Sequence, residues 1–290
     1  MSRVLITGAN GFLGSVVVND LCEAGHHVRA LVRSAPQAAS FPGSVEVMTG
    51  DVRDADDMKK ATVGCDGVIH LAGKAHAVDE LQADPHDYHL TNVEGTRHVL
   101  EGAASAQVQR IIYISSVKVF GESTVKCVDE TAAPDPQTAY ARSKWQAEQL
   151  VSEHGKRTGA IVISLRLPMV YGQTNKGNLY RMIAAIDHGR FPPFPKVANQ
   201  RSLVHVRNVA GAILRCLQQS GTKLAAYIVA DARPYSTTYL YESLSRGLGK
   251  RPPNWRVPLS VLRAAARIGD LIQKGTGRTV PLSTGTLNKL

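Results

Sequence analysis

A tyrosine and a lysine, four residues apart, are the side chains of this sequence best placed to move a proton. Tyr140 and Lys144 lie in a segment with helical character that continues to Val151, so both project from one face of the same helix. A phenol is normally far too weak an acid to exchange protons at neutral pH. A neighbouring ammonium favours the phenolate and lowers the pKa of the tyrosine. The spacing therefore predicts an acid–base tyrosine supported by a lysine.

Two serines at the end of a predicted strand can complete this pair. Arg110–Ser116 (RIIYISS) reads as a buried strand that delivers Ser115 and Ser116 to its carboxyl end, upstream of Tyr140. Ligands of open α/β sheets bind at that end of the strands. A serine hydroxyl there can donate a hydrogen bond to a substrate oxygen, so we expect the chemistry where this strand ends.

A glycine-rich turn near the N-terminus predicts where an anionic cofactor binds. Arg3–Thr7 is a short apolar run suited to a buried parallel strand, and helical apolar content follows from Phe12. Gly8, Gly11 and Gly14 line the turn between them, where side chains would keep a diphosphate away from the N–H groups at the helix N-terminus. Glycines also mark ordinary turns, but this placement between strand and helix predicts a dinucleotide site.

The end of the next strand bears on the choice of cofactor. His27–Val32 reads as that strand, and Arg33 follows it. An acid at this position would bond the ribose 2′-hydroxyl of NAD, whereas an arginine accommodates the 2′-phosphate of NADP. No acid is near, so the charge favours NADP(H), with NAD(H) as the alternative cofactor. The other interpretation of Arg33 is an ordinary surface loop residue.

Alternating strands and helices organise the chain into an α/β protein. The predicted strands span residues 3–7, 27–32, 45–49, 67–72, 110–116 and 161–167. These strand-plus-crossover units predict a Rossmann-type doubly wound parallel sheet over residues 1–172. Beyond it prolines cluster and the helical stretches shorten (178–188, 208–219, 237–248), which predicts a smaller C-terminal lobe over 173–290 with some segments returning to the sheet domain. Pro258–Ile272 reads as an amphipathic helix packed on that lobe, with an exposed membrane-surface or partner helix as the alternative.

Several short motifs, in order and correctly spaced, resemble one family. TGANGFLG is followed by GDV, HLAG, a helix starting at Asn92 with NVEGT, and then SSVKVFG, YARSK and RLPMVYG. This set resembles the extended short-chain dehydrogenase/reductase family, in its nucleotide-sugar (NAD-dependent epimerase/dehydratase) branch. The branch includes 4-epimerases, 4,6-dehydratases and 4-ketoreductases. The resemblance implies a Rossmann domain, a substrate-binding lobe and a UDP-linked sugar as substrate.

The resemblance also implies the roles of individual residues. The expected catalytic residues are Ser116, Tyr140 and Lys144, and Lys144 also holds the ribose of the nicotinamide half. The expected cofactor contacts are Gly8, Asn10, Gly11, Phe12, Leu13, Gly14, Arg33, Asp51, Val52, Leu71, Ala72, Gly73, Asn92, Tyr140, Lys144, Pro168 and Val170. The expected substrate contacts are Lys74, Ser116, Lys118, Asn178, Leu179 and Arg201. Asp51, Lys118 and Arg201 each have a solvated side chain as the alternative interpretation.

The residues after the catalytic serine narrow the reaction. The 4,6-dehydratases of this family carry an Asp–Glu pair there, whereas Val117 and Lys118 stand here. The segments SSVKV, KGN and NQRSLV resemble bacterial reductases of UDP-4-keto-6-deoxy-N-acetylhexosamines that serve surface polysaccharide synthesis. With Arg33, this favours an NADP(H)-dependent 4-ketoreductase over an NAD-dependent UDP-sugar 4-epimerase. A catalytically silent NADP(H) sensor or scaffold is the alternative from another class, and the intact catalytic set argues against it.

Composition excludes several other classes. The net charge of +10 is dispersed, without basic blocks or an aromatic-studded stripe, which argues against nucleic-acid binding. The four cysteines lie far apart without a metal-ligand pattern, which predicts free thiols in a reducing cytoplasm and no metal site. No run is long enough to span a membrane, although peripheral association stays open. The family resemblance implies a homodimer.

Overall fold

The chain folds into two compact units. In this computed structural model the described residues are 1–34, 41–74, 84–122, 127–173, 177–191, 195–197, 199–219, 224–252, 255–276, 280, 284 and 287. The first unit comprises Met1–Thr174 and Val204–Asp231, and the second comprises Asn175–Leu203 and Ala232–Leu290. Each unit is described by itself.

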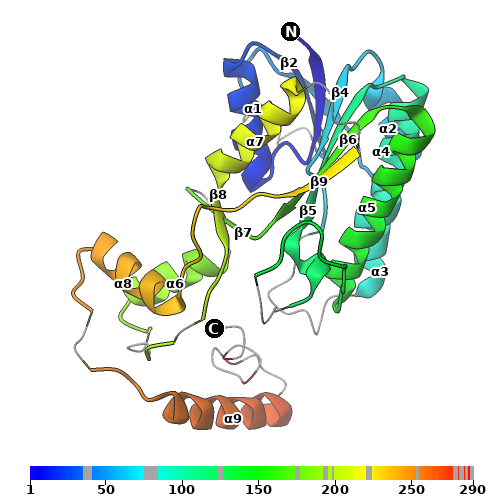
Figure 1. Cartoon of the computed structure of the whole chain (residues 1–290). Helices are drawn as coiled ribbons and strands as arrows, with labels where there is room; N and C mark the ends of the chain where they lie inside the picture. The colour runs from blue at the N-terminus through cyan, green and yellow to red at the C-terminus, as the bar shows by residue number, and fades with distance from the viewer. Residues whose placement is uncertain are drawn as a thin grey trace. The chain divides into compact units, whose positions relative to one another are not determined.

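The first unit is built on a seven-stranded, all-parallel sheet (Figure 1). Its central strands alternate little between polar and apolar residues, because helices cover both faces of the sheet. The strand order is β3-β2-β1-β4-β5-β6-β9. The strands span Arg3–Thr7 (β1), His27–Val32 (β2), Glu46–Thr49 (β3), Gly67–His70 (β4), Arg110–Ser116 (β5), Ile161–Leu167 (β6) and Leu224–Ile228 (β9). The predicted doubly wound Rossmann-type sheet is confirmed.

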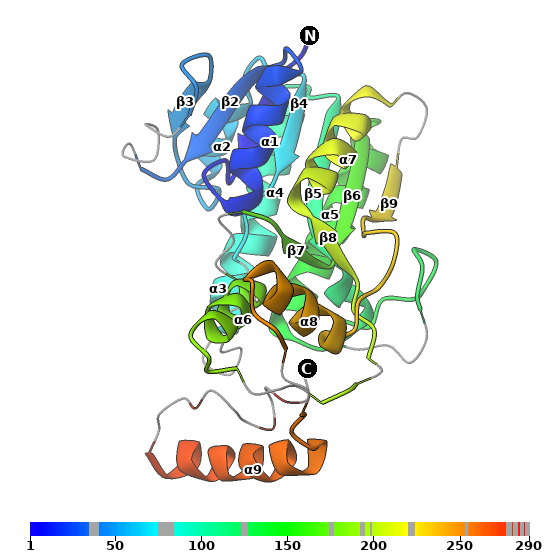
Figure 2. The ribbon, with the colours of Figure 1, turned by 90° about the vertical axis from the view of Figure 1, so that its left-hand side faces the viewer.

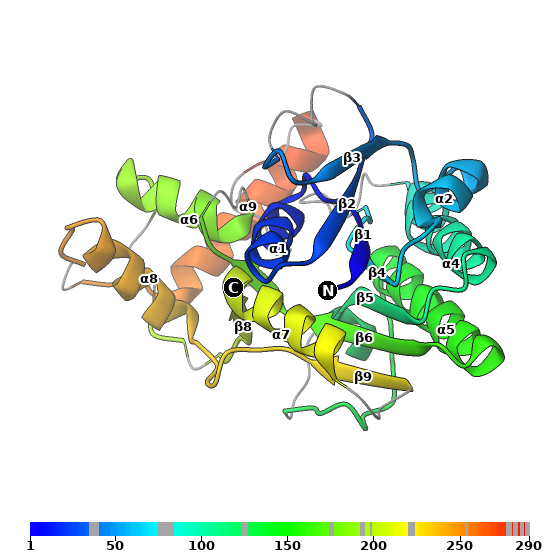
Figure 3. The same ribbon diagram turned by 90° about the horizontal axis from the view of Figure 1, so that it is seen from above.

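Two layers of helices bury the two faces of this sheet. The helices on one face are α1 (Phe12–Glu23) and α7 (Val206–Gln218), which lie in front of the strands in Figure 2. Those on the other face are α2 (Ala55–Thr62), α4 (Gly95–Ser105) and α5 (Ala139–Thr158), and Figure 3 shows them along the opposite side of the sheet. Each layer contributes its own cluster of buried apolar side chains. Both faces of the sheet are therefore buried.

Several elements differ from the sequence prediction, among them a strand at the sheet edge and the turn at Asn92. β9 is a seventh strand that pairs in parallel with β6, and its sequence, LAAYI, has no strong strand pattern. The helix expected from Asn92 is preceded by α3 (Pro85–Tyr88) and by a π-helical turn, η2 (His89–Glu94), before α4 begins. Asn92 therefore lies in an irregular turn of the kind often found at functional sites.

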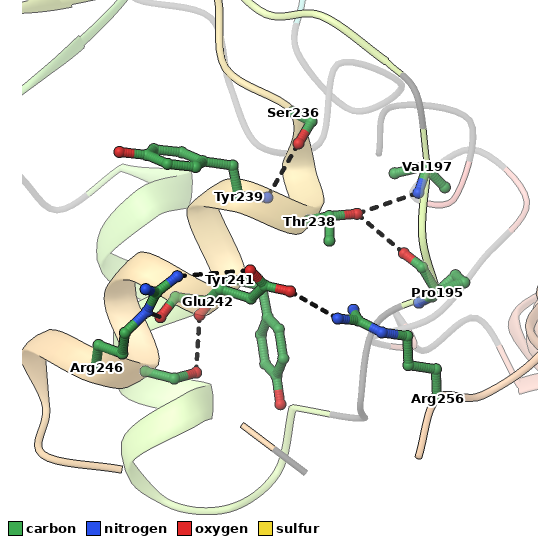
Figure 4. A network of polar contacts seen from close by, with 10 residues as sticks. Pro195, Val197, Ser236, Thr238, Tyr239, Tyr241, Glu242, Arg246 and Arg256 are labelled. Atoms are coloured by element: carbon green, nitrogen blue, oxygen red, sulfur yellow. Dashed lines mark hydrogen bonds and ion pairs between the residues drawn. The ribbon is translucent and has the colours of Figure 1, made fainter. Parts of the chain in front are cut away.

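The second unit is helical. Its helices are α6 (Asn178–Asp187), α8 (Thr237–Gly247) and α9 (Leu259–Thr276), and a separate apolar cluster holds them together. Figure 4 shows polar contacts around α8, where Thr238 Oγ1 accepts the N–H of Val197 at 3.1 Å and donates to the carbonyl of Pro195 at 3.1 Å. The short strands β7 (Met169–Tyr171) and β8 (Leu203–His205) form a two-stranded sheet of their own.

Three sequence expectations concern features outside the sheet. All four cysteines are free, as predicted. Within the described residues, no group of histidine, cysteine, aspartate and glutamate side chains is placed to hold a metal ion. Among the helices of the described chain, none combines the length and the apolar character that crossing a bilayer requires.

Candidate active site

Helix α5 carries the predicted tyrosine and lysine on one face. Thr138 caps its N-terminus, where Thr138 Oγ1 accepts the N–H of Ala141 at 3.2 Å. The helix ends at Gly159, whose φ of 75° is the left-handed conformation that glycine adopts readily. Lys144 is buried and Tyr140 is half-buried, because their common face packs toward β5. The cap thus begins the helix just before Tyr140 and fixes its position.

Ser116 and Tyr140 meet at the end of β5, as the sequence predicts. The Ser116 side chain is buried and shares a hydrogen bond with the Tyr140 phenol. Ser116 Oγ also accepts the N–H of Lys118 at 3.2 Å, which begins the 3-10 turn η3 (Val117–Phe120). Tyr88 lies edge-on to Tyr140, with ring centroids 5.9 Å apart. Its contact with the phenol could not be inferred from the chain spacing.

The protonation of Tyr140 differs from the prediction. Burial raises the pKa of Tyr140 to about 12, and the hydrogen bond with Ser116 opposes this rise. The predicted lowering of the phenol pKa by Lys144 is therefore wrong for this structure. Lys144 Nζ instead donates to the carbonyl of Ile114 at 2.9 Å and lies 4.9 Å from the ring centroid of Tyr113. Burial lowers the pKa of Lys144 to about 8, against an opposing contribution from Glu148.

Asn92 joins the loop after β4 to helix α5. Its Oδ1 accepts the backbone N–H of Lys74 at 2.7 Å, and its Nδ2 donates to Ser143 Oγ at 2.9 Å. A Cβ added to Gly73 would lie 3.1 Å from Asn92 Oδ1 and 3.2 Å from Lys144 Nζ. Gly73 therefore packs against both Asn92 and Lys144. The three residues form one continuous wall that includes the lysine of the Tyr140–Lys144 pair.

A buried histidine that the sequence analysis did not single out supports this wall. His70 Nδ1 lies 2.7 Å from Thr7 Oγ1, and its Nε2 lies 3.0 Å from Thr96 Oγ1. Burial and the charge of Lys144 lower the pKa of His70 to about 3, so the ring is neutral. The chain Thr7–His70–Thr96 ties β1 and β4 to α4. The signal in the sequence, a polar residue ending an apolar strand, is too common to have identified it.

The glycine turn has the geometry that a dinucleotide needs. A Cβ added to Gly8 would lie 2.7 Å from the backbone nitrogen of Ala72, and one added to Gly14 would lie 2.2 Å from the carbonyl oxygen of Gly8. Gly8 also has a φ of 69°. No side chain caps α1 at Gly11, and its first turn carries no acid, so the N-terminal N–H groups of the helix face no competing protein anion there.

These features test whether the residues present fit a nicotinamide dinucleotide. A diphosphate fits an uncapped helix N-terminus beside a turn without side chains. The neighbouring predicted contacts lie in the same unit: Asn10 is exposed, and Phe12, Leu13, Leu71, Ala72, Pro168 and Val170 are half-buried. The side-chain-free turn, the uncapped start of α1 and the wall formed by Gly73, Asn92 and Lys144 together fit a nicotinamide dinucleotide.

Arg33 and Asp51 lie at the ends of neighbouring strands. Both follow strands of the paired β2–β3 edge, and the charge of Arg33 helps to lower the pKa of the Asp51 carboxyl. The larger cause of that shift is the hydrogen bond from Arg53, whose Nη2 lies 2.7 Å from Asp51 Oδ2. Val52 is buried and packs against Gly95 at the start of α4. Arg33 is exposed at this edge of the sheet.

The predicted substrate residues are divided between the two units. Lys74 forms an ion pair with Asp87, and Lys118 forms one with Glu122, so both ammonium groups already have an acidic partner. Asn178 begins α6, and its side chain lies outside the described residues, whereas Leu179 is half-buried. The substrate role predicted for Lys74 and Lys118 therefore stays a prediction, since the contacts seen for both ammonium groups are with acids of the chain itself.

Arg201 lies in the second unit and pairs through its backbone with Tyr235. The two residues exchange N–H···O bonds of 2.9 Å and 2.8 Å. The guanidinium Nε is buried without a hydrogen-bond partner among the described residues, and burial lowers the pKa of Arg201. Arg201 as a whole is half-buried, and a guanidinium with an unpartnered N–H suits an anionic ligand.

Comparison with known proteins identifies the family and several relatives of the chain. The family model described as "NAD dependent epimerase/dehydratase family" matches residues 4–230. The chain is 28% identical over 289 residues to N-acetyl-alpha-D-glucosaminyl-diphospho-ditrans,octacis-undecaprenol 4-epimerase of Escherichia coli O157:H7, which covers 99% of this chain and 85% of that protein. It is 28% identical over 273 residues to 4-hydroxy-2-methyl-3-oxo-4-farnesyl-3,4-dihydroquinoline-1-oxide ketoreductase of Stigmatella aurantiaca, covering 92% of this chain and 80% of that protein.

A solved structure is similar along most of the chain. MoeE5 in complex with UDP-glucuronic acid and NAD superposes with a TM-score of 0.76 at 26% identity, covering 86% of this chain and 83% of that one. The Rossmann-type fold is thus found in a protein that binds both a nicotinamide dinucleotide and a UDP-sugar.

Proposed function

The chain belongs to the NAD dependent epimerase/dehydratase family, and on that premise we propose that it is an NADP(H)-dependent 4-ketoreductase of a nucleotide sugar. The substrate of this proposal is a UDP-linked 4-keto-6-deoxy-N-acetylhexosamine, used in surface polysaccharide synthesis. The observation that carries the choice of cofactor is Arg33, an exposed cation at the end of β2 where an NAD-specific site would place an acid. The ketoreductase relative supports reduction as a chemistry of such chains.

The chain's own residues supply the proton and the orientation. A bound reduced nicotinamide would supply the hydride that adds to C4 of the keto sugar. Ser116 donates a hydrogen bond to the C4 oxygen and holds the carbonyl in place. Tyr140 transfers its phenolic proton to the same oxygen as the C4–H bond forms, so the ketone becomes an alcohol with hydride and proton accounted for. Lys144 is assigned to the ribose hydroxyls of the nicotinamide half.

The protonation of Tyr140 suits this direction of reaction. A proton donor must carry its proton at neutral pH, and a pKa of about 12 keeps the phenol protonated. Arg201 and the N-terminus of α6 are the residues that we assign to the substrate diphosphate, because an unpartnered guanidinium nitrogen and a helix N-terminus both favour an anion. We also propose that the chain is a cytoplasmic homodimer, although no step of the mechanism depends on this.

The test is turnover of a UDP-4-keto-6-deoxy-N-acetylhexosamine with NADPH. The wild-type chain should oxidise NADPH in step with the appearance of the 4-hydroxy sugar. Tyr140→Phe should reduce kcat by roughly 100-fold or more while NADPH binding is retained. Tyr239→Phe is the matched control, since Tyr239 is an exposed tyrosine of α8 in the second unit. Full turnover by Tyr140→Phe would contradict the mechanism.

A UDP-sugar 4-epimerase is the second candidate. The E. coli relative is named a 4-epimerase, and the similar structure was solved with NAD and a UDP-sugar. An epimerase takes a hydride from C4 and returns it to the other face, so it keeps its cofactor and consumes none. Interconversion of UDP-hexoses without net change in NAD(H) would establish this candidate. Binding of NADPH with turnover of neither substrate class would instead indicate a sensor.

A further inference from the structure

Helix α9 carries an apolar stripe that its own unit does not bury. Leu262 and Ala266 point into the apolar cluster of the second unit. Val261, Ile268 and Leu271 are 53%, 58% and 69% exposed. At 100° per residue, these three positions fall within roughly 80° of the helix circumference, on the side away from the buried pair. The outer face of α9 is therefore continuous and apolar.

This stripe differs from the other exposed apolar side chains of the described chain. Val63, Tyr180 and Trp255 are also exposed, but they lie in three separate segments. Apolar residues exposed singly are normal on a folded protein. Several of them aligned along one helix mark a surface that contacts something apolar. A purely structural role for the stripe leaves this alignment unexplained.

Positive charge borders the stripe on one side. Arg263 and Arg267 are exposed, lie one turn apart and occupy the helix surface between the apolar stripe and the buried face. The acid in the described part of α9 is Asp270, which is half-buried on the same flank as the two arginines and accepts the N–H of Thr284 at 3.0 Å. The apolar stripe is thus bordered on one side by two exposed cations, and none of the residues described on the stripe itself carries a carboxylate.

The helix is attached to a folded unit and is not a free amphipathic tail. Arg256, just before α9, donates from Nη2 to Glu242 Oε1 of α8 at 2.6 Å (Figure 4). Arg246 of α8 lies 3.5 Å from the same carboxylate. With Leu262 and Ala266 in the apolar cluster, this ion pair orients the stripe before any partner arrives, which reduces the ordering that binding requires.

We propose that α9 docks on the surface of an anionic phospholipid bilayer. Val261, Ile268 and Leu271 would enter the boundary between headgroups and acyl chains, while Arg263 and Arg267 would lie against the lipid phosphates. An apolar face flanked by arginines is the arrangement that interfacial helices use. The net charge of +10 adds long-range attraction to such a surface. The inference goes beyond the proposed reaction and does not depend on it.

The test is flotation of the full chain with lipid vesicles, one set of phosphatidylcholine alone and one with a quarter phosphatidylglycerol. The wild type should float with the anionic vesicles, and raising the salt should weaken this binding because exposed charges are screened. Ile268→Glu should lower the apparent affinity about tenfold or more, since an apolar side chain is withdrawn from the interface. Arg263→Gln with Arg267→Gln should weaken the preference for the anionic vesicles, because two of the cations nearest the stripe are lost while a net charge of +8 (+10 less 2) remains.

Val63→Glu is the matched control, because it places the same charge on an apolar side chain that is 62% exposed in the first unit. It should float as the wild type does. Circular dichroism and the melting temperature of each variant establish that it is folded. Wild-type protein that stays with the soluble fraction in both vesicle sets, or Ile268→Glu that floats as well as wild type, would overturn the proposal. A dimer would be a further contrary result. If the wild type binds no vesicles and light scattering shows a dimer that Ile268→Glu dissociates, then the stripe of α9 contacts a second copy of the chain and not a bilayer.

Discussion

Asn92 and Ser143 are joined by a hydrogen bond of 2.9 Å that connects the π-helical turn η2 to α5, the helix that carries Tyr140 and Lys144. The same amide accepts the backbone N–H of Lys74 at 2.7 Å. Both bonds are local in space but join segments far apart in the chain. One buried side chain therefore sets the distance between the loop at Gly73 and the helix at Lys144.

Asn92→Ala should destabilise the chain and slow catalysis. It leaves the Lys74 N–H without this partner and removes the bond that the Ser143 hydroxyl accepts, although that hydroxyl still donates to the Tyr140 carbonyl. A polar group left unsatisfied away from water costs about 1–3 kcal/mol. Urea unfolding measures the loss. Asn208→Ala is the matched control, because Asn208 is exposed and bonds Asp231 at 3.1 Å, so its loss should stay below about 1 kcal/mol. Equal stability of the two variants would contradict the bracing role of Asn92.

Gly14→Ala should abolish cofactor binding. Its Cβ would lie 2.2 Å from the Gly8 carbonyl oxygen, which is backbone and has to move, so the turn between β1 and α1 would be distorted. Gly211→Ala makes the same change in α7, where a Cβ meets open space, and should stabilise the chain by about 0.5–1 kcal/mol. Fluorescence titration with NADPH and thermal melting compare the two. Normal binding by a folded Gly14→Ala chain would show that the close packing is dispensable.

Removing one member of the buried ion pair Glu148–Arg166 should destabilise the chain more than replacing both. Arg166 Nη2 lies 2.8 Å from Glu148 Oε2, and both side chains are buried. Glu148→Ala strands a buried cation, with an expected loss of about 3–5 kcal/mol. Replacing both residues, Glu148→Leu with Arg166→Met, should recover much of that stability. A double variant as unstable as Glu148→Ala in urea would contradict this interpretation.

Lys144 should make stability rise with pH in the alkaline range. Its pKa is lowered from 10.5 to about 8 by burial, so between these values the unfolded chain holds a proton that the folded chain has lost. Unfolding then takes up protons, and the free energy of unfolding increases with pH. Lys144→Met should remove this contribution. We expect the wild-type advantage over Lys144→Met to grow from pH 8 to pH 10, and a constant difference would contradict the lowered pKa.

The features that sequence spacing predicted correctly are those that depend on neighbouring residues in the chain. The glycine turn and the Tyr140–Lys144 pair follow from short-range rules for helices and turns, and the structure has Tyr140 with Ser116 at the end of β5. β9 was missed because a short alanine-rich edge strand is defined by its partner β6 and not by its own pattern.

Tertiary partners account for the remaining differences. The bonds of His70 and the acid facing Lys74 come from segments that only the fold brings near, so no spacing revealed them. The pKa of Tyr140 was predicted in the wrong direction because burial, which raises it, outweighs the hydrogen bond with Ser116 that lowers it. The partner of Lys118 is different, since Glu122 lies four residues on and was accessible to sequence reasoning.

Reduction with NADPH requires that the chain prefer NADPH to NADH, which titration of the purified chain and of Arg33→Ala with each cofactor measures, after a check for co-purified cofactor. We expect the wild type to prefer NADPH by about tenfold or more, and Arg33→Ala to lose this preference while binding NADH as before. Tightly retained NAD without a preference for NADPH would contradict it and would direct the next assay to the interconversion of UDP-hexoses.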